Sequence, residues 1–170
     1  MIKIIGIDPG LSATGIGIVR GNGSNLLGYS FGSINTSKNK SLPNRLSHIF
    51  SKILQILNAE KPDLMVLEDV FSLSEYPKSG ITLGQVTGVV MLAACQADVA
   101  SVEIAVREAK QVLTGNGNAS KMQLEESVRH RLNHKSIIRP YHASDALGLA
   151  LIGFYRYYQD HLNQKTDIDS

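Results

Sequence analysis

The apolar positions at the beginning of the chain predict three neighbouring β-strands. Apolar side chains dominate residues 2–7, 14–19 and 26–34, and glycine-containing turns separate the three runs. Strands joined by such short turns pair antiparallel with their neighbours. We therefore expect the N-terminal part of the chain to form a three-stranded meander.

The next part of the chain has helical periodicity. Between residues 41 and 59 the apolar side chains share one helical face and the polar ones occupy the other, which predicts an amphipathic helix packed on the sheet. After the breaker Pro62, residues 64–67 form a short, wholly apolar run that is typical of a central strand. A helix followed by a strand of the same sheet implies a right-handed crossover.

The second half of the chain alternates helices and strands. We expect a loop at 71–80, a helix at 81–96, a strand at 99–106, a helix at 120–132 that begins with a capping box, and a last helix from about residue 143. The helix at 81–96 is apolar on nearly all sides, so it should be buried on both faces. Gly84 and Gly88 would let it approach a sheet, another helix or a second subunit closely.

The resulting order, βββαβαβαα, indicates an α/β fold with a central mixed five-stranded sheet and helices on both faces. We expect one domain over residues 1–163 and a flexible C-terminal tail at 164–170.

Composition excludes several classes of protein. The chain has 170 residues, which is enough to bury a core without disulfides or a structural metal, and its single cysteine, Cys95, favours a reducing compartment such as the cytoplasm. The longest apolar stretch, 81–97, is interrupted by polar residues and glycines and is too short to span a bilayer. The chain goes from Met1 directly into a predicted strand, so we expect no signal peptide.

The distribution of charge points to a polyanionic partner. The net charge is only +2, but residues 107–139 carry seven lysines and arginines against three acids, and residues 38–52 carry four without any acid. Solvated helix faces would produce the same pattern, so both interpretations stay open.

Two carboxylates follow apolar strands directly. Asp8 ends the first predicted strand and Glu68 ends the fourth, and the carboxyl ends of parallel strands are where open α/β sheets bind ligands. The alternative for Asp8 is a simple turn-forming role before Pro9 and Gly10.

His142 and Asp145 add a third element, because a spacing of three residues places both on one face at the start of the last helix. Together with Asp8 and Glu68 they would supply oxygen ligands and one imidazole, a set suited to magnesium or manganese and to two-metal cleavage of a phosphodiester. The alternative is that Asp145 only complements the helix dipole and His142 belongs to the preceding loop.

Other chemistries lack partners. His130 and His134 have a zinc-like spacing without the glutamate or cysteines of a zinc motif, and Ser144 lacks the glycines of a nucleophile elbow. The turn at 115–118 resembles a phosphate-binding loop only loosely, although it could hold a backbone phosphate at the following helix N-terminus.

Five segments, in order, resemble the successive motifs of the RuvC family of Holliday junction resolvases: GIDPGLSATG (6–15), LEDVF (67–71), LGQVTG (83–88), AKQV (109–112) with 115–121, and ASDAL (143–147). The resemblance extends to about Phe154. It implies a ribonuclease H-like fold and magnesium-dependent, paired nicking of four-way DNA junctions by a homodimer in the bacterial cytoplasm, associated with the nucleoid, in cooperation with the RuvA and RuvB branch-migration proteins.

The resemblance also assigns roles to residues. Asp8, Glu68 and Asp145 match the family's catalytic, metal-binding acids. Lys110 and Lys121 match its functional lysines near the DNA backbone. Phe71 matches the aromatic residue thought to stack on a base at the crossover.

His142 departs from the best-known members, which carry a fourth aspartate there, although other members carry histidine. An imidazole removes one negative charge and titrates near neutral pH, so manganese would serve as well as magnesium. The first loop is also similar to that of actin-like ATPases and sugar kinases, but those folds need two such domains and 170 residues supply only one, so no ATP binding is expected. Two other functions stay open: a nuclease of the same fold acting on RNA precursors, and a catalytically silent junction-binding dimer.

Overall fold

The computed structural model describes residues 1–69 and 77–166, and the side chains of 1–69 and 80–157. Its five strands form one mixed sheet of order β3-β2-β1-β4-β5. The strands are β1 (Ile2–Asp8), β2 (Ala13–Asn22), β3 (Asn25–Asn35), β4 (Leu64–Glu68) and β5 (Ser101–Ile104). The first three pair antiparallel, whereas β4 runs parallel to both β1 and β5. The predicted meander and the central position of β1 and β4 are confirmed.

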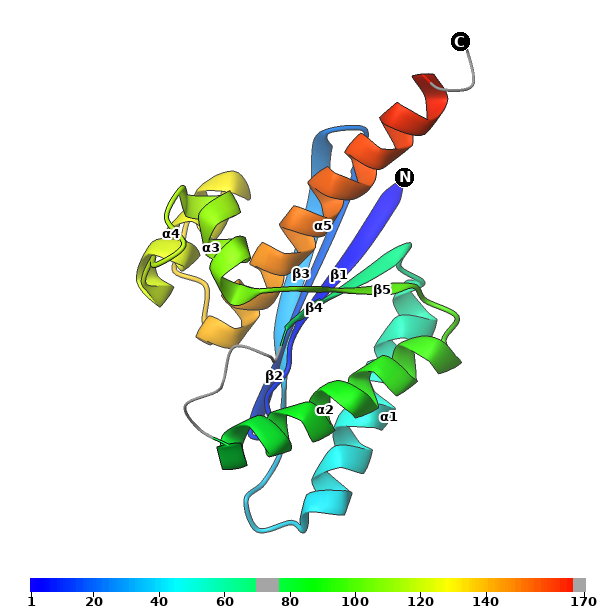
Figure 1. The fold of residues 1–170 in the computed structure, drawn as a ribbon, viewed down its shortest axis with the longest axis vertical. Helices are drawn as coiled ribbons and strands as arrows, with labels where there is room; N and C mark the ends of the chain where they lie inside the picture. The colour runs from blue at the N-terminus through cyan, green and yellow to red at the C-terminus, as the bar shows by residue number, and fades with distance from the viewer. Residues whose placement is uncertain (70–76, 167–170) are drawn as a thin grey trace.

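Helices cover both faces of this sheet (Figure 1). The helices α1 (Leu42–Glu60) and α2 (Pro77–Gln96) pack on one face, and α5 (Tyr141–Thr166) crosses the other. The two short helices α3 (Val106–Thr114) and α4 (Lys121–Arg131) lie beside α5. In the described part of the chain, no helix combines the length and the apolar character that crossing a bilayer requires.

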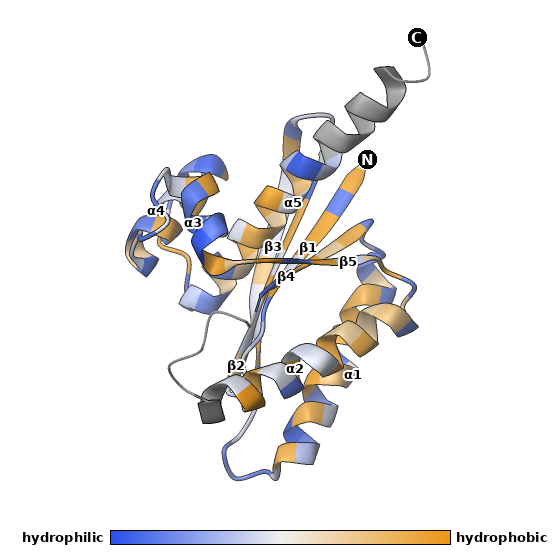
Figure 2. Cartoon of the chain, viewed as in Figure 1, coloured by the Kyte–Doolittle hydropathy of each residue, from blue (hydrophilic) through white to orange (hydrophobic). Residues whose placement is uncertain are grey.

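The alternation of side chains along the strands divides the core into two layers. Ile5 and Ile7 of β1, with Met65 and Leu67 of β4, point toward α1 and α2. Ile4 and Val66 point the other way, toward α5, α3 and α4. Figure 2 shows apolar residues on the sides of the helices that meet the sheet. Both β1 and β4 therefore have buried residues on both faces, as expected of the central strands of an α/β sheet.

The structure differs from the sequence predictions in three places. The sequence predicts a strand at 99–106 and no helix directly after it, whereas the structure has β5 followed by α3. Helix α3 buries only Ala109 and Leu113, so its apolar periodicity is short. Helix α2 begins at Pro77 inside the predicted loop at 71–80, since proline fits the first turn of a helix. Helix α5 continues through Thr166, past the predicted domain limit at residue 163.

Helix α2 is buried on one side only within this chain. Val86, Val90 and Ala93 are fully buried against α1 and the sheet, whereas Ile81 and Leu92 stay 66% and 50% exposed. The expected burial of both faces is therefore not met inside the chain.

Glycines in β1 and β2 let the backbone of α5 lie directly on the sheet. Gly6 and Gly17 are register partners, and Gly15 is two residues from Gly17, so all three face α5. A Cβ at Gly6 would lie 2.0 Å from the carbonyl oxygen of Ala146, and one at Gly17 would lie 2.4 Å from the Leu147 nitrogen. Both contacts involve backbone atoms, so α5 would have to move away from the sheet to accept any side chain here.

We predict that Gly17→Ala lowers the free energy of unfolding by about 2 kcal/mol or more, because the added methyl group overpacks a contact that cannot relax. Gly32→Ala in β3 is the matched control, since a Cβ there meets nothing within 4 Å and alanine is the better strand residue. Urea denaturation of both variants checks this, and equal stabilities would show that α5 does not approach the sheet so closely.

Candidate active site

Asp8 and Glu68 end the two central parallel strands side by side. The last register pair of β1 and β4 is Ile7 with Leu67, so the next residue of each strand is an acid. In a strand, residues two positions apart point to the same face of the sheet. Asp8 is two residues from Gly6 and Glu68 is two residues from Val66, and both Gly6 and Val66 face α5. The two carboxylates therefore lie at one sheet edge, on the face that α5 covers.

The first turns of α5 bring His142 and Asp145 to the same edge. The Nδ1 atom of His142 lies 2.5 Å from Oδ2 of Asp8, although 134 positions separate the two residues in sequence. The Nζ atom of Lys121, the first residue of α4, lies 4.0 Å from Oδ2 of Asp145. Asp8 is 5% exposed, and these contacts bring side chains of β1, α4 and α5 to this edge of the sheet.

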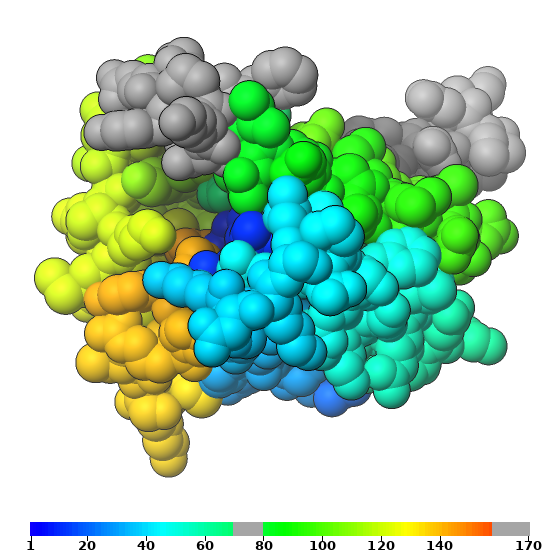
Figure 3. Space-filling model, turned by 90° about the horizontal axis from the view of Figure 1, so that it is seen from below, coloured from blue at the N-terminus to red at the C-terminus, as the bar shows by residue number. Residues whose placement is uncertain are grey.

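The edge is recessed in the molecular surface. In Figure 3 the dark blue atoms near the beginning of the chain lie in a hollow, with yellow-green and orange atoms on one side and the cyan and green atoms of α1 and α2 on the other. The segments that border this hollow thus include α4 and the beginning of α5, which carry Lys121 and His142.

Burial and crowding raise the pKa of two of the carboxylates. Burial raises the pKa of Glu68 far above its usual value, and the negative charge of Asp8 raises it further. Burial also raises the pKa of Asp145 to about 6, with Asp8 again adding to the effect and Lys121 opposing it. Ionising these acids together is therefore costly unless a positive charge compensates them.

His142 is joined to Asp8 by a hydrogen bond. This bond raises the pKa of the His142 imidazole above its ordinary 6.5, and partial burial opposes the shift. Asp8 therefore makes protonation of His142 more favourable than it is in a free histidine.

One oxygen of the cluster has no partner among the described residues. Oδ1 of Asp145 is buried and accepts no hydrogen bond from them, which is costly for a carboxylate unless a donor or a cation is supplied. Among the side chains that the structure describes, however, no three His, Cys, Asp or Glu residues stand close enough together to hold one metal ion jointly. Asp8 is hydrogen-bonded to His142, Asp145 is paired with Lys121, and a side-chain contact with Asp8 adds to the raised pKa of Glu68.

Gln111 organises the turn at 115–118, which precedes Lys121, a role that the sequence pattern does not predict. Its side-chain amide donates to the carbonyl of Gly115 at 2.9 Å, and its Oε1 accepts from the Gly117 nitrogen at 3.0 Å. The capping box of Ser120 and Gln123 then starts α4, as predicted. Gln111 thereby fixes the turn that places Lys121. In the sequence, Gln111 stands out only as the neighbour of Lys110. Hydrogen bonds from a side chain to a turn follow no characteristic sequence spacing, so the sequence does not predict this contact.

The other predicted DNA-binding residues fall in different places. Lys110 lies half-buried on α3, and its charge lowers the pKa of Asp145, so it contributes positive potential at the cluster. Phe71 lies outside the described residues.

Comparison with known proteins places the chain in a family. Residues 4–153 match the family model "Crossover junction endodeoxyribonuclease RuvC". A protein of that name from Rhodopirellula baltica is 36% identical over 152 residues, which cover 89% of this chain and 85% of the relative. One from Vibrio campbellii is 40% identical over 152 residues, covering 89% and 86% of the two chains.

The fold agrees with a solved structure of the same family. The structure of Thermus thermophilus RuvC in complex with a Holliday junction substrate superimposes with a TM-score of 0.84 at 28% identity, covering 94% of this chain and 97% of the other. The expected ribonuclease H-like fold is confirmed by this match. The chain belongs to the RuvC family of crossover junction endodeoxyribonucleases.

Proposed function

We propose that this chain resolves four-way DNA junctions during recombination and repair, by hydrolysing one phosphodiester bond in each of two strands of like polarity. The observation that carries the proposal is the gathering of Asp8, Glu68 and Asp145 at one recessed sheet edge. The relative from T. thermophilus, with the same fold, was solved with a Holliday junction substrate, which supports the choice of DNA substrate.

The cluster suits magnesium or manganese. Carboxylate oxygens are the ligands that these ions prefer, and Asp145 has a buried oxygen without a partner. A cation would also relieve the repulsion that raises the pKa of Glu68 and Asp145. We assign Asp8, Glu68, Asp145 and His142 as the ligands, with two ions per site as in other nucleases.

The reaction adds the oxygen of water to phosphorus and breaks the bond to the 3′ oxygen, which takes up a proton. The products are a 5′ phosphate and a 3′ hydroxyl. A bound divalent cation supplies an activated water and offsets the charge on the leaving oxygen.

The remaining steps belong to side chains of this protein. Asp8 would be one of the residues that hold the cation, and its Oδ2 is the atom that contacts His142. Lys121, whose side chain is 62% exposed, is free to turn from Asp145 toward a phosphate oxygen, and Lys110 adds positive charge on the same side. We assign Phe71, in the segment after Glu68, to stacking on a base at the crossover.

We predict metal-dependent, symmetric nicks in a synthetic mobile four-way junction, with none in a linear duplex and none in EDTA. Asp8→Asn should lower the nicking rate by more than about 100-fold, because even residues that only support metal ligands contribute 10–100-fold. Denaturing gels of end-labelled strands measure both. Tight junction binding without nicking in either metal would instead indicate a silent junction-binding protein, and cutting of structured RNA alone would indicate an RNA nuclease.

We predict that His142 makes the reaction sensitive to acid. An imidazole ligates a cation only when its nitrogen is unprotonated, and the bond to Asp8 raises the pKa of His142 above 6.5, so activity should fall as the pH drops below about 7. In His142→Asp the ligand is a carboxylate, whose ordinary pKa lies below that of imidazole, so the fall should be shallower. Single-turnover rates between about pH 5.5 and 8.5 provide the test. Superimposable profiles would contradict a ligand role for His142.

Paired cutting also needs two active sites, and we propose that α2 forms the interface of a homodimer. Residues spaced by three or four along α2 make an exposed stripe, which comprises Ile81, Gly84, Gly88, Leu92 and Cys95. A Cβ at either glycine would meet nothing within 4 Å, so the helix surface is open to a second helix there. A two-fold pairing of this surface would present two like sites to a junction.

We predict that Leu92→Glu converts the protein from a dimer to a monomer, because it places two like charges in an apolar contact. Leu27→Glu is the matched control, since Leu27 is 65% exposed on β3, on an edge strand far from α2 in the sheet order. Light scattering after size exclusion gives the mass of each variant. A monomeric parent protein, or a dimeric Leu92→Glu variant, would contradict this assignment.

A further inference from the structure

Arg139 presents an uncommitted positive charge three residues before His142. The residue is exposed, and its guanidinium carbon lies 3.8 Å from the centre of the Tyr141 ring. A guanidinium stacked in this way keeps the N–H donors along its edge available for a planar anion. Within the described residues, Arg139 forms no ion pair with a carboxylate.

Other arginines of the same basic region are used inside the protein. Nε of Arg129 contacts Oε1 of the buried Glu125 at 3.2 Å, and Arg131 donates to the carbonyl oxygen of Leu113 at 3.0 Å. Arg156 pairs with Glu108. These three arginines therefore bind groups of the protein itself, whereas Arg139 has no such ion pair within the described residues.

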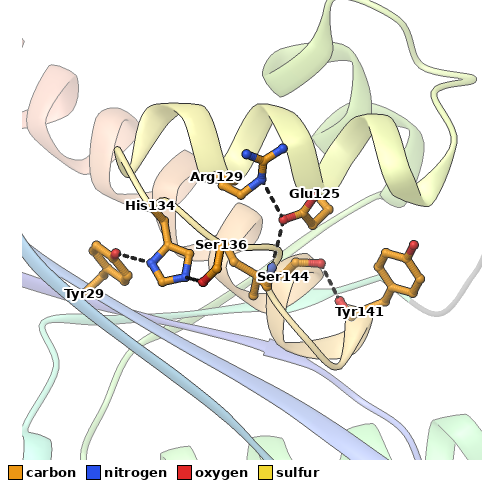
Figure 4. A network of polar contacts seen from close by, with 8 residues as sticks. Tyr29, Glu125, Arg129, His134, Ser136, Tyr141 and Ser144 are labelled. Atoms are coloured by element: carbon orange, nitrogen blue, oxygen red, sulfur yellow. Dashed lines mark hydrogen bonds and ion pairs between the residues drawn. The ribbon is translucent and has the colours of Figure 1, made fainter.

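The backbone on either side of Arg139 is fixed. Ile138 is fully buried, and its nitrogen donates to Oε1 of Glu125 at 2.9 Å. The carbonyl oxygen of Tyr141 accepts from Oγ of Ser144 at 2.8 Å (Figure 4). Arg139 is therefore held between two anchored residues, and little conformational freedom is left to lose when it binds a ligand.

A second set of contacts ties the same segment to the sheet. His134 shares a hydrogen bond of 2.6 Å with the hydroxyl of Tyr29 on β3 and one of 3.1 Å with Ser136 (Figure 4). The segment between α4 and α5 is thus braced from α4, from β3 and from α5, so its surface is a rigid element beside the active site.

We propose that Arg139, stacked on Tyr141, binds a backbone phosphate of the DNA strand that lies in the active site. This inference rests on the proposed junction-cutting function. The Cα atoms of Arg139 and His142 are at most about 11 Å apart, because three peptide units separate them. A strand whose reacting phosphate lies at the carboxylates therefore passes within reach of this guanidinium, which matches a phosphate with two parallel N–H bonds.

The test is junction binding in EDTA as a function of salt, measured by fluorescence anisotropy. Arg139→Ala should weaken binding about tenfold at 0.1 M salt and make the plot of log affinity against log salt shallower by about 1, the loss of one phosphate contact. Arg139→Lys should keep the salt dependence of the parent and recover only part of the affinity, because lysine lacks the stacked fork. Tyr141→Phe should bind like the parent protein.

Lys61→Gln is the matched control. Lys61 is exposed, and its replacement by glutamine removes one positive charge, as Arg139→Ala does. Lys61 lies three residues before β4 begins, at the edge of the sheet opposite Glu68. Its affinity and salt dependence should equal those of the parent. An Arg139→Ala variant that binds like the parent, while Lys121→Ala binds more weakly, would overturn the proposal for Arg139 alone. A parent protein that binds duplex as tightly as junction would instead overturn the proposed function.

Discussion

The close contact between α5 and the glycine-lined face of β1 and β2 is the constraint on which the site depends. It brings the helix backbone, rather than side-chain tips, against the sheet at Gly6, Gly15 and Gly17. The contact involves helix residues His142, Ala146 and Leu147, so the same turns that touch the sheet carry the catalytic candidates. A helix at ordinary packing distance would leave His142 and Asp145 too far from Asp8 to share a ligand.

This packing has an electrostatic cost that the protein offsets locally. Three carboxylates are brought together where water has limited access, which raises the pKa of two of them. The hydrogen bond between His142 and Asp8 and the ion pair between Lys121 and Asp145 hold the arrangement together. A bound cation would take the place of Lys121 beside Asp145 and leave the lysine to contact a DNA phosphate.

Much of this could be predicted from the sequence, for physical reasons that are visible in particular residues. The alternation of apolar residues located β1 to β3, and acids directly after buried strands identified Asp8 and Glu68. The sequence also predicts that Asp8 and Gly6 point to the same face of the sheet, because they are two residues apart in a strand. Which helix covers that face follows only from the tertiary packing. Helix α3 escaped prediction because two buried residues make too short a periodic signal, and the clamp made by Gln111 depends on contacts that local pattern does not encode.

The distance along the chain between Asp8 and His142 bears on how the protein is made. Synthesis proceeds from the N-terminus, so the meander and the first acid leave the ribosome well before α5 exists. Without that last helix the sheet lacks its cover, and the acids lack both the imidazole and Asp145. A nascent chain, or one truncated before residue 141, therefore carries no assembled nuclease site, and DNA-cutting capacity arises only once α5 has been synthesised.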